Sequence, residues 1–204
     1  MTTTQKPGPR DRLLDAAAGL FYREGVATGI DALCKAAGVS KRSMYQLFAS
    51  KDEVLAAALE RQGPVVDARL LPPPGDPAAP RDRVLYVFER MEEVAASDGY
   101  RGCPFLAAQV ELKDPEHPAS VVARRTKQGL TDFFRAEAAR AAVADPELLA
   151  RRLTLIFDGA SARAGIGVEV LDGLAVTTAA AVLDAAGMTA GPSGEAAAQA
   201  SGRR

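Results

Sequence analysis

Apolar residues recur along most of the chain at intervals of three and four, which is the spacing of amphipathic helices. Near the start, Leu13, Leu14, Ala17, Leu20 and Phe21 share one helical face. Alanine is abundant and alternating runs of β-branched residues are scarce, so we predict an all-α fold. The predicted helices span residues 10–24, 31–37, 41–48, 50–70, 81–98, 102–113, 118–144, 146–165 and 170–186.

The segment "LPPPGDPAAP" at residues 71–80 cannot lie inside a helix, because its prolines lack an amide hydrogen and restrict the backbone. We interpret it as a connection between helical parts. The chain begins with polar residues and two prolines, and its end is poor in bulky apolar side chains. The predicted organisation is a flexible arm over 1–9, a first helical domain over 10–62, a second over 63–187 and a disordered tail over 188–204.

Composition narrows the class of protein only moderately. Hydrophobic residues make up 48% of the 204 residues, and the formal net charge is −1. Residues 1–62 hold 9 Lys/Arg and 7 Asp/Glu, a slight positive excess. Two cysteines are too few for a disulfide scaffold. We find no signal peptide and no apolar run of roughly 18 residues, so we expect a cytoplasmic protein without a membrane partner.

Two short predicted helices, "IDALCKAA" and "KRSMYQLF", are joined by the tight turn "GVS", which is typical of a helix-turn-helix. Val39, Met44 and Phe48 lie on one side of the second helix and are expected to pack inward. The other side carries donor-bearing side chains, which are Lys41, Arg42, Ser43, Tyr45 and Gln46. Such a helix fits the major groove of DNA. The alternative is a solvated surface of a helical bundle, since this motif also occurs without DNA.

The stretch "FYREGVATGIDALCKAAGVSKRSMYQLFASKDEVLAAALE" (21–60) resembles the DNA-binding domain of the TetR family of bacterial transcriptional regulators. The shared features are Phe21, Gly25, the "AGVS" turn, the spacing of Tyr45 and Phe48, and "SKDEVL". The resemblance implies a homodimer in which residues 10–62 form a three-helix DNA-binding domain. The second domain would then serve ligand binding and dimerisation. Members usually repress transcription from a double-stranded DNA operator and release it when a small-molecule effector binds.

The resemblance also implies which residues meet DNA. Tyr45 and Lys51 fall where family members contact phosphate, and Thr28 or a bare amide would do so near the start of the preceding helix. The full predicted set is Thr28, Ser40, Lys41, Arg42, Ser43, Tyr45, Gln46 and Lys51. The sequence departs from the family pattern in three places. Arg42 stands where a small residue is frequent, Leu47 replaces a frequent His, and "ATGID" is one residue short.

The second domain offers candidates for a ligand pocket. Phe105 and Gln109 lie one turn apart and share a helix face. The predicted pocket residues are Tyr86, Met91, Cys103, Phe105, Gln109 and Phe133. Because most are apolar, we expect an uncharged or weakly charged ligand of modest size.

Two helical stretches, 149–165 and 171–187, are rich in small and apolar residues. In the family these two helices from each subunit would form a four-helix dimer interface, whereas the plainer alternative is an ordinary core within one subunit. The candidate contact residues are Leu155, Ala162, Leu174 and Ala181.

The remaining reactive side chains do not indicate catalysis. Cys103 stands at a predicted helix start, where a thiol pKa can be lowered, but we favour a buried small residue there and at Cys34. Asp114, Glu116 and His117 lie in a turn without further metal ligands, so we predict no metal site. No nucleotide loop or catalytic triad is present, and we predict no enzyme and no cofactor. The expected function is a dimeric DNA-binding regulator. The alternative is a helical small-molecule-binding protein without DNA binding.

Overall fold

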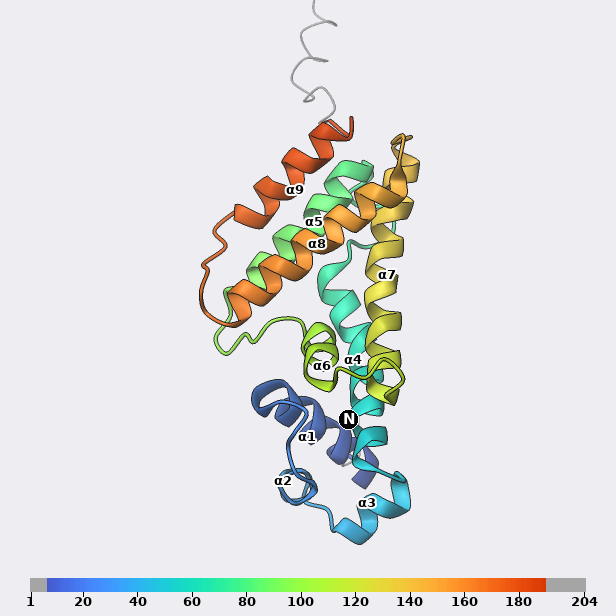
Figure 1. Ribbon diagram of the computed structural model, residues 1–204, viewed down its shortest axis with the longest axis vertical. Helices are drawn as coiled ribbons and strands as arrows, with labels where there is room; N and C mark the ends of the chain where they lie inside the picture. Colours follow the sequence, from blue (N-terminus) through green and yellow to red (C-terminus); the bar gives the residue numbers. More distant parts are fainter. Residues whose placement is uncertain (1–6, 190–204) are drawn as a thin grey trace, which may run out of the picture.

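A computed structural model describes residues 7–189, which form nine α-helices and no strand (Figure 1). The all-α prediction is therefore confirmed. The helices are α1 (Pro9–Glu24), α2 (Ile30–Ala37), α3 (Lys41–Leu47), α4 (Lys51–Leu70), α5 (Pro80–Ala95), α6 (Pro104–Leu112), α7 (Pro118–Arg140), α8 (Pro146–Gly165) and α9 (Leu174–Ala185). None of these helices combines the length and the apolar character needed to cross a membrane.

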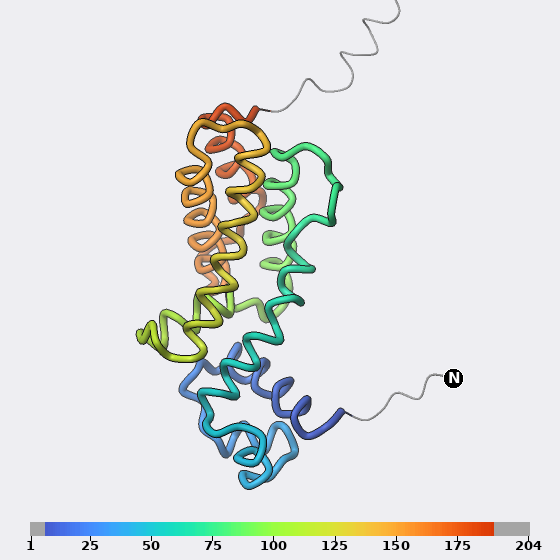
Figure 2. Tube along the Cα trace, turned by 90° about the vertical axis from the view of Figure 1, so that its right-hand side faces the viewer, coloured from blue at the N-terminus to red at the C-terminus, as the bar shows by residue number. Residues whose placement is uncertain are grey.

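The first three helices gather at one end of the molecule, and with the first half of α4 they form a unit that we call the head (Figure 1). From there α4 continues into the body as one helix of 20 residues, with Pro64 inside it. The body consists of α5, α7, α8 and α9, and α6 lies where body and head meet (Figures 1 and 2). Because α7 packs along both α4 and α8, it joins the two parts.

Local signals in the sequence fix many of the helix starts. Ser40, Ser50 and Asp145 cap α3, α4 and α8, each accepting a hydrogen bond from the backbone amide three residues later. α5, α6, α7 and α8 each begin with a proline, whose fixed backbone angle suits the first helical position. These signals explain why the predicted helices agree closely with the observed ones.

Two hydrophobic cores lie within the described residues. The first joins α1–α4 to α6 and the start of α7, so Phe105 and Ala123 pack with residues of the head. The second fills the body, where the ring of Phe88 lies 5.7 Å from that of Phe134 and 6.3 Å from that of Phe157. The predicted domain boundary after residue 62 falls inside α4, and the core of the head includes residues from beyond it.

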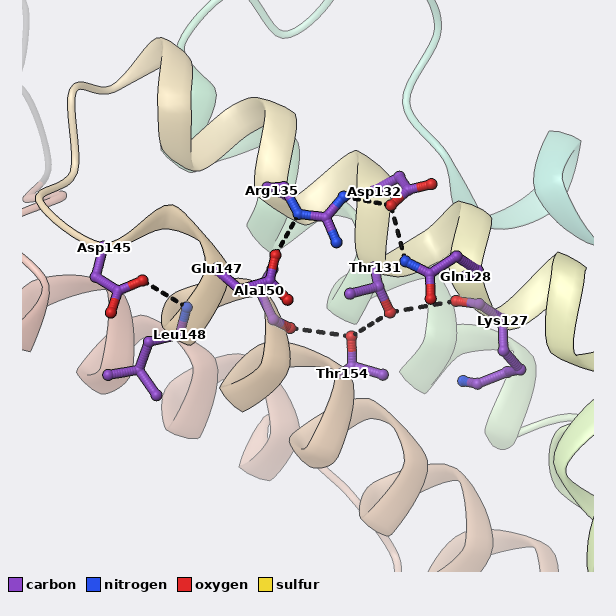
Figure 3. A network of polar contacts seen from close by, with 10 residues as sticks. All are labelled: Lys127, Gln128, Thr131, Asp132, Arg135, Asp145, Glu147, Leu148, Ala150 and Thr154. Carbon is purple, nitrogen blue, oxygen red and sulfur yellow. Dashed lines mark hydrogen bonds and ion pairs between the residues drawn. The ribbon is translucent and has the colours of Figure 1, made fainter.

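Figure 3 shows two polar contacts that join α7 to α8. Near the middle, the Oγ1 atoms of Thr131 and Thr154 lie 3.0 Å apart. Toward the far end, Arg135 donates to a carboxylate oxygen of Glu147 over 2.6 Å. These contacts hold α7 and α8 together in the body.

The first residue of the tail predicted over 188–204 is packed in the body. The side chain of Met188 is 4% exposed and belongs to the core of the body. Its carbonyl accepts a hydrogen bond of 2.6 Å from Arg81. The rest of the predicted tail, residues 190–204, and residues 1–6 of the predicted arm lie outside the described residues.

At the end of α8 the backbone lies directly against the backbone of the loop between α5 and α6. A Cβ atom built on Gly165 would lie 2.4 Å from the amide nitrogen of Gly102. No side chain fits there, because the obstructing atoms are backbone and cannot turn aside. Only glycine at residue 165 allows the loop that leads into α6 to rest on α8.

Replacing Gly165 by alanine should therefore destabilise the protein by about 1–3 kcal/mol, since the loop must shift to admit a methyl group. Gly129 is a matched control because it also lies in a helix, and a Cβ built there meets nothing within 4 Å. Gly129→Ala should stabilise by roughly 0.5–1 kcal/mol through helix propensity. Urea denaturation at one fixed protein concentration measures both, and equal effects would contradict the close approach.

Candidate nucleic-acid interface and adjoining cavities

The second and third helices form a helix-turn-helix, as predicted. At the turn Gly38 adopts a left-handed conformation with φ of 62°, and the amide of Val39 donates to the carbonyl of Cys34 over 3.0 Å. Met44 is fully buried and Phe48 nearly so. One face of α3 is thus fixed on the core of the head, and its opposite face points to solvent.

The exposed face of α3 carries the donors that the sequence placed there. Arg42, Tyr45 and Gln46 are all exposed, with 52% of Tyr45 accessible. Lys41 is exposed as well, and its ammonium lies 2.7 Å from a carboxylate oxygen of Asp31 on α2. This face has the dimensions and the donors that a major groove accepts.

The two serines at the start of α3 are occupied within the protein. The Ser40 hydroxyl oxygen accepts from the amide of Ser43 over 3.0 Å and lies 2.9 Å from the Ser43 hydroxyl. Both side chains therefore stabilise the helix start. Their predicted contact with DNA stays a prediction.

Thr28 does not present its side chain as the sequence suggested. The residue is 8% exposed, and its hydroxyl donates to the carbonyl of Gly25 over 2.9 Å. This hydroxyl therefore completes a turn within the protein, and its predicted phosphate contact stays a prediction. The backbone amides at the start of α2 remain available for the predicted phosphate contact, because the N-cap residue Gly29 has no side chain to bond them.

Lys51 has a structural role that sequence reasoning missed. Its ammonium donates to the carbonyls of Val26 over 2.8 Å and Thr28 over 3.3 Å. These bonds tie the start of α4 to the loop between α1 and α2. A lysine ammonium has three N–H donors, so one is left for the predicted phosphate contact.

The same loop is held from the body side by Glu111 of α6. A carboxylate oxygen of Glu111 accepts from the amide of Val26 over 2.8 Å. That oxygen would lie 2.6 Å from a Cβ built on Gly25, so glycine leaves room for it. We call Glu111, Val26 and Lys51 the loop clamp, because the two side chains bind the amide and the carbonyl of one residue.

A second contact between body and head involves His117, the single histidine. Its Nδ1 accepts from the amide of Ala119 over 3.1 Å and so caps α7, while Nε2 lies 3.4 Å from a carboxylate oxygen of Asp52. Within the described residues, no group of three or more metal-ligating side chains is close enough to hold an ion. Asp114 instead accepts from the amide of Glu116 over 2.9 Å.

Two arginines of α1, which were not among the predicted DNA-binding residues, add positive charge beside the helix-turn-helix. The guanidinium of Arg10 lies over the ring of Phe48, 5.4 Å from its centroid. Arg12 donates to the carbonyl of Ala37 over 3.2 Å, at the end of α2. Both contacts fix α1 against the two helices that would meet DNA.

A cavity of about 430 Å³ lies between head and body, and we call it the junction cavity. Its lining comes from α1, α4, α5, the loop between α5 and α6, the start of α6, and α8. A second cavity of about 350 Å³ adjoins it between α1, α4 and α6. Tyr22 and Gln62 line both cavities and so stand between them.

Known proteins resemble the chain in both sequence and structure. The sequence profile described as "Bacterial regulatory proteins, tetR family" matches residues 13–58. A crystal structure from Streptomyces avermitilis MA-4680, described as a TetR transcriptional regulator, is 59% identical. The match covers 89% of this chain and 100% of that chain, with a TM-score of 0.87. The chain belongs to the TetR family of bacterial transcriptional regulators.

More distant relatives are described as transcriptional regulators too. SCO4454, a TetR-family transcriptional regulator from Streptomyces coelicolor, is 28% identical over 87% of this chain and 95% of its own, with a TM-score of 0.80. The HTH-type transcriptional regulator YjdC of Escherichia coli K12 is 23% identical over 156 residues, which is 76% of this chain and 82% of that protein. The likeness to TetR-family proteins therefore extends well beyond the helix-turn-helix.

The cavity of this TetR-family regulator includes only two of the six predicted pocket residues, Met91 and Cys103. Neither Tyr86 nor Phe133 lines it. Phe105 is 1% exposed and packs in the core of the head, and the Gln109 amide donates to the carbonyl one turn earlier in its own helix. Phe105 and Gln109 do lie one turn apart on α6, but helical spacing alone does not tell whether a helix face lines a cavity or packs against another helix.

The two cysteines of this TetR-family regulator differ in environment. Cys34 is 5% exposed and belongs to the core, as predicted. Cys103 caps the start of α6 and lines the junction cavity. Burial raises the pKa of the Cys103 thiol, against a smaller lowering by the positive charge of Lys127. The thiol therefore stays protonated at neutral pH, contrary to the lowered pKa considered from the sequence.

The loop clamp generates a prediction about how the head is held. Glu111→Ala should speed hydrogen exchange at the Val26 amide and cost about 1 kcal/mol of stability, because one exposed hydrogen bond to a carboxylate is lost. Glu116→Ala is the matched control, since it removes the same charge from a neighbouring turn. Hydrogen exchange followed by NMR measures the effect. Unchanged exchange at Val26 in Glu111→Ala would show that the clamp does not hold in solution.

Proposed function

We propose that this TetR-family protein binds a palindromic DNA operator as a homodimer, represses transcription there and leaves the operator when a small molecule binds. The observation that carries the proposal is the exposed face of α3. Arg42, Tyr45 and Gln46 project from a helix whose other side is anchored by fully buried Met44. The backbone of a packed helix is already ordered before binding, so only the exposed side chains lose freedom, which suits sequence reading.

The exposed side chains support a division between base reading and phosphate contact. Arg42 and Gln46 are the candidates for base edges, because Arg pairs with guanine and Gln with adenine through two hydrogen bonds each. Tyr45, the third N–H of Lys51 and the free amides at the start of α2 are candidates for phosphate, which fixes register. The ion pair with Asp31 would orient Lys41 until a phosphate competes for its charge.

An apolar surface on α8 and α9 supports the dimer. Leu155 on α8 and Ile166 directly after it are 74% and 73% exposed, and Ala162 between them is exposed too. On α9, Leu174 and Ala181 are exposed on the same side of that helix. Exposed apolar surface of this kind marks an interaction site. A two-fold dimer through it would present two copies of α3 to inverted half-sites.

Contacts between body and head support release by a ligand. The loop clamp, the His117–Asp52 contact and the continuous α4 all link the position of the head to the body. A ligand that favours one arrangement of the body would therefore shift the spacing of the two α3 helices. The size of this shift is limited by the difference in ligand affinity between the arrangements.

Operator selection from random DNA tests the proposal directly. The wild-type protein should enrich an inverted repeat, and Arg42→Ala should relax one position in each half-site by roughly 1–3 kcal/mol, because one bidentate contact is lost. Lys113→Ala, which removes a positive charge from an exposed turn of the body, should return the wild-type motif. Gel shifts at two salt concentrations measure the affinities.

Two results would contradict this proposal. Selection that enriches no sequence would favour a helical small-molecule-binding protein without DNA binding. An Arg42→Ala protein that returns the wild-type motif at full information content would remove Arg42 from base reading.

The dimer is tested by placing a charge on the exposed surface of α8. Ala162→Glu should give monomers and weaken operator binding at least about 100-fold, because a buried carboxylate without a partner costs several kcal/mol. Ala139→Glu is the matched control, since Ala139 is exposed on α7, away from that surface. Light scattering measures the mass. A stable dimer of Ala162→Glu would move the interface elsewhere.

A further inference from the structure

One wall of the junction cavity belongs to the DNA-binding head itself. Asp15, Ala18, Gly19 and Tyr22 of α1 line it, facing residues of α5 and α8. α1 also packs against α2, α3 and α4, so it forms the base on which the helix-turn-helix rests. A molecule in this cavity would therefore touch the head directly, without any intervening helix.

The inner part of the junction cavity is apolar and uncharged. Met91, Phe157 and Ser161 are at most 3% exposed and contribute thioether, ring and hydroxyl. The charged lining residues Asp15, Arg69 and Asp98 are exposed, which puts their charges at the mouth. The ammonium of Lys127, 4.9 Å from the centroid of the Phe157 ring, is already paired with the carboxylate of Asp158. A charged group carried to the inner part would therefore lose its hydration without meeting an unpaired opposite charge, and that costs several kcal/mol.

A few hydroxyl groups are the hydrogen-bonding groups in the inner part of the junction cavity. The hydroxyls of Tyr100 and Ser161 lie 2.7 Å apart, and Tyr22 donates to the carbonyl of Gly102 over 3.1 Å. Burial raises the pKa of Tyr100 to about 12 and also raises that of Tyr22, so both stay neutral at physiological pH. Neutral hydroxyls can hydrogen-bond to a ligand, but they do not neutralise a charge on it.

We propose that the junction cavity binds an uncharged amphipathic small molecule, an apolar ring or chain with one or two hydrogen-bonding groups, and that this molecule acts on DNA binding through α1. The proposal rests on the proposed function and specifies its effector and its site. The volume of about 430 Å³ lies within the roughly 300–1,000 Å³ of small-molecule sites.

Tyr22 is the contact through which the bound molecule acts on α1. Its hydroxyl accepts from the amide of Arg101 over 2.7 Å and donates to the carbonyl of Gly102, so it ties α1 to the loop between α5 and α6. That loop rests on Gly165 and cannot yield toward α8. A molecule that takes over the Tyr22 hydroxyl therefore releases α1 rather than the loop, and the head moves.

Three naphthalene probes test the ligand class on the free protein. Naphthol, naphthoate and naphthylmethylammonium share one ring system and differ in head group, which is neutral, anionic or cationic at pH 7. Naphthol should bind about ten-fold or more tightly than either charged probe, because only the charged heads lose uncompensated hydration. Isothermal titration measures this. Equal or tighter binding of naphthoate or naphthylmethylammonium would overturn the neutral class.

Tryptophan substitutions locate the site. Val66→Trp fills the junction cavity, whereas Val65→Trp places the same side chain on the exposed side of α4. Val66→Trp should abolish naphthol binding and Val65→Trp should keep it. The chain has no tryptophan, so the emission maximum also reports whether the new ring is buried. Val94→Trp on α5 replaces Val66→Trp if that variant does not fold.

Ala107 lines only the second cavity, so Ala107→Trp tests that alternative site. Loss of naphthol binding in Ala107→Trp with binding kept in a folded Val66→Trp or Val94→Trp protein would overturn the assignment to the junction cavity. Loss in the junction-cavity variants alone supports it.

The regulatory half of the proposal is tested with the selected operator. Naphthol should weaken operator binding about five-fold or more, and operator should weaken naphthol binding by the same factor. In Tyr22→Phe, naphthol should still bind but this factor should fall toward one. Binding without any effect on operator affinity, or an unchanged factor in Tyr22→Phe, would overturn action through α1. Naphthol binding needs no DNA, so failure of operator selection would refute the proposed function and leave the site standing.

Discussion

The apolar contact that packs the head against α6 and the start of α7 is the constraint on which the other features depend. Phe105 is 1% exposed there, and fully burying a phenylalanine contributes about 1.5–3 kcal/mol. The head therefore cannot swing on α4 as a free unit. Because α1 and α6 are held together, Glu111 can reach the loop of the head, and the junction cavity has a wall on each side.

Much of the fold could be predicted because its signals are local. Prolines and capping side chains lie at the helix starts, and the spacing of Met44 and Phe48 already showed which side of α3 is buried. The exposed donors Arg42 and Gln46 follow from that orientation. A short amphipathic helix with one apolar face leaves little choice for the opposite face, which is why this part of the candidate site was readable from sequence.

The parts that could not be predicted depend on residues distant in the chain. Glu111 meets Val26 across 85 positions, and Tyr22 meets Gly102 across 80. Lys51 was assigned to phosphate from the resemblance to the TetR family, but two nearby carbonyls already accept from it. Pairings of this kind depend on how helices stack, and periodicity within one helix carries no information about its neighbours. The cavity lining escaped prediction for the same reason.

The continuity of α4 gives the molecule a lever. Lys51 lies thirteen positions before Pro64 in one unbroken helix, a length of about 20 Å. Pro64 lacks an amide hydrogen, so the helix is least stiff at that point. A bend of about ten degrees there would carry the Lys51 end through roughly 3 Å, close to the rise of one base pair. A bend too small to disturb the packing of the body would thus move the Lys51 end of α4 far enough to put α3 out of register with its half-site.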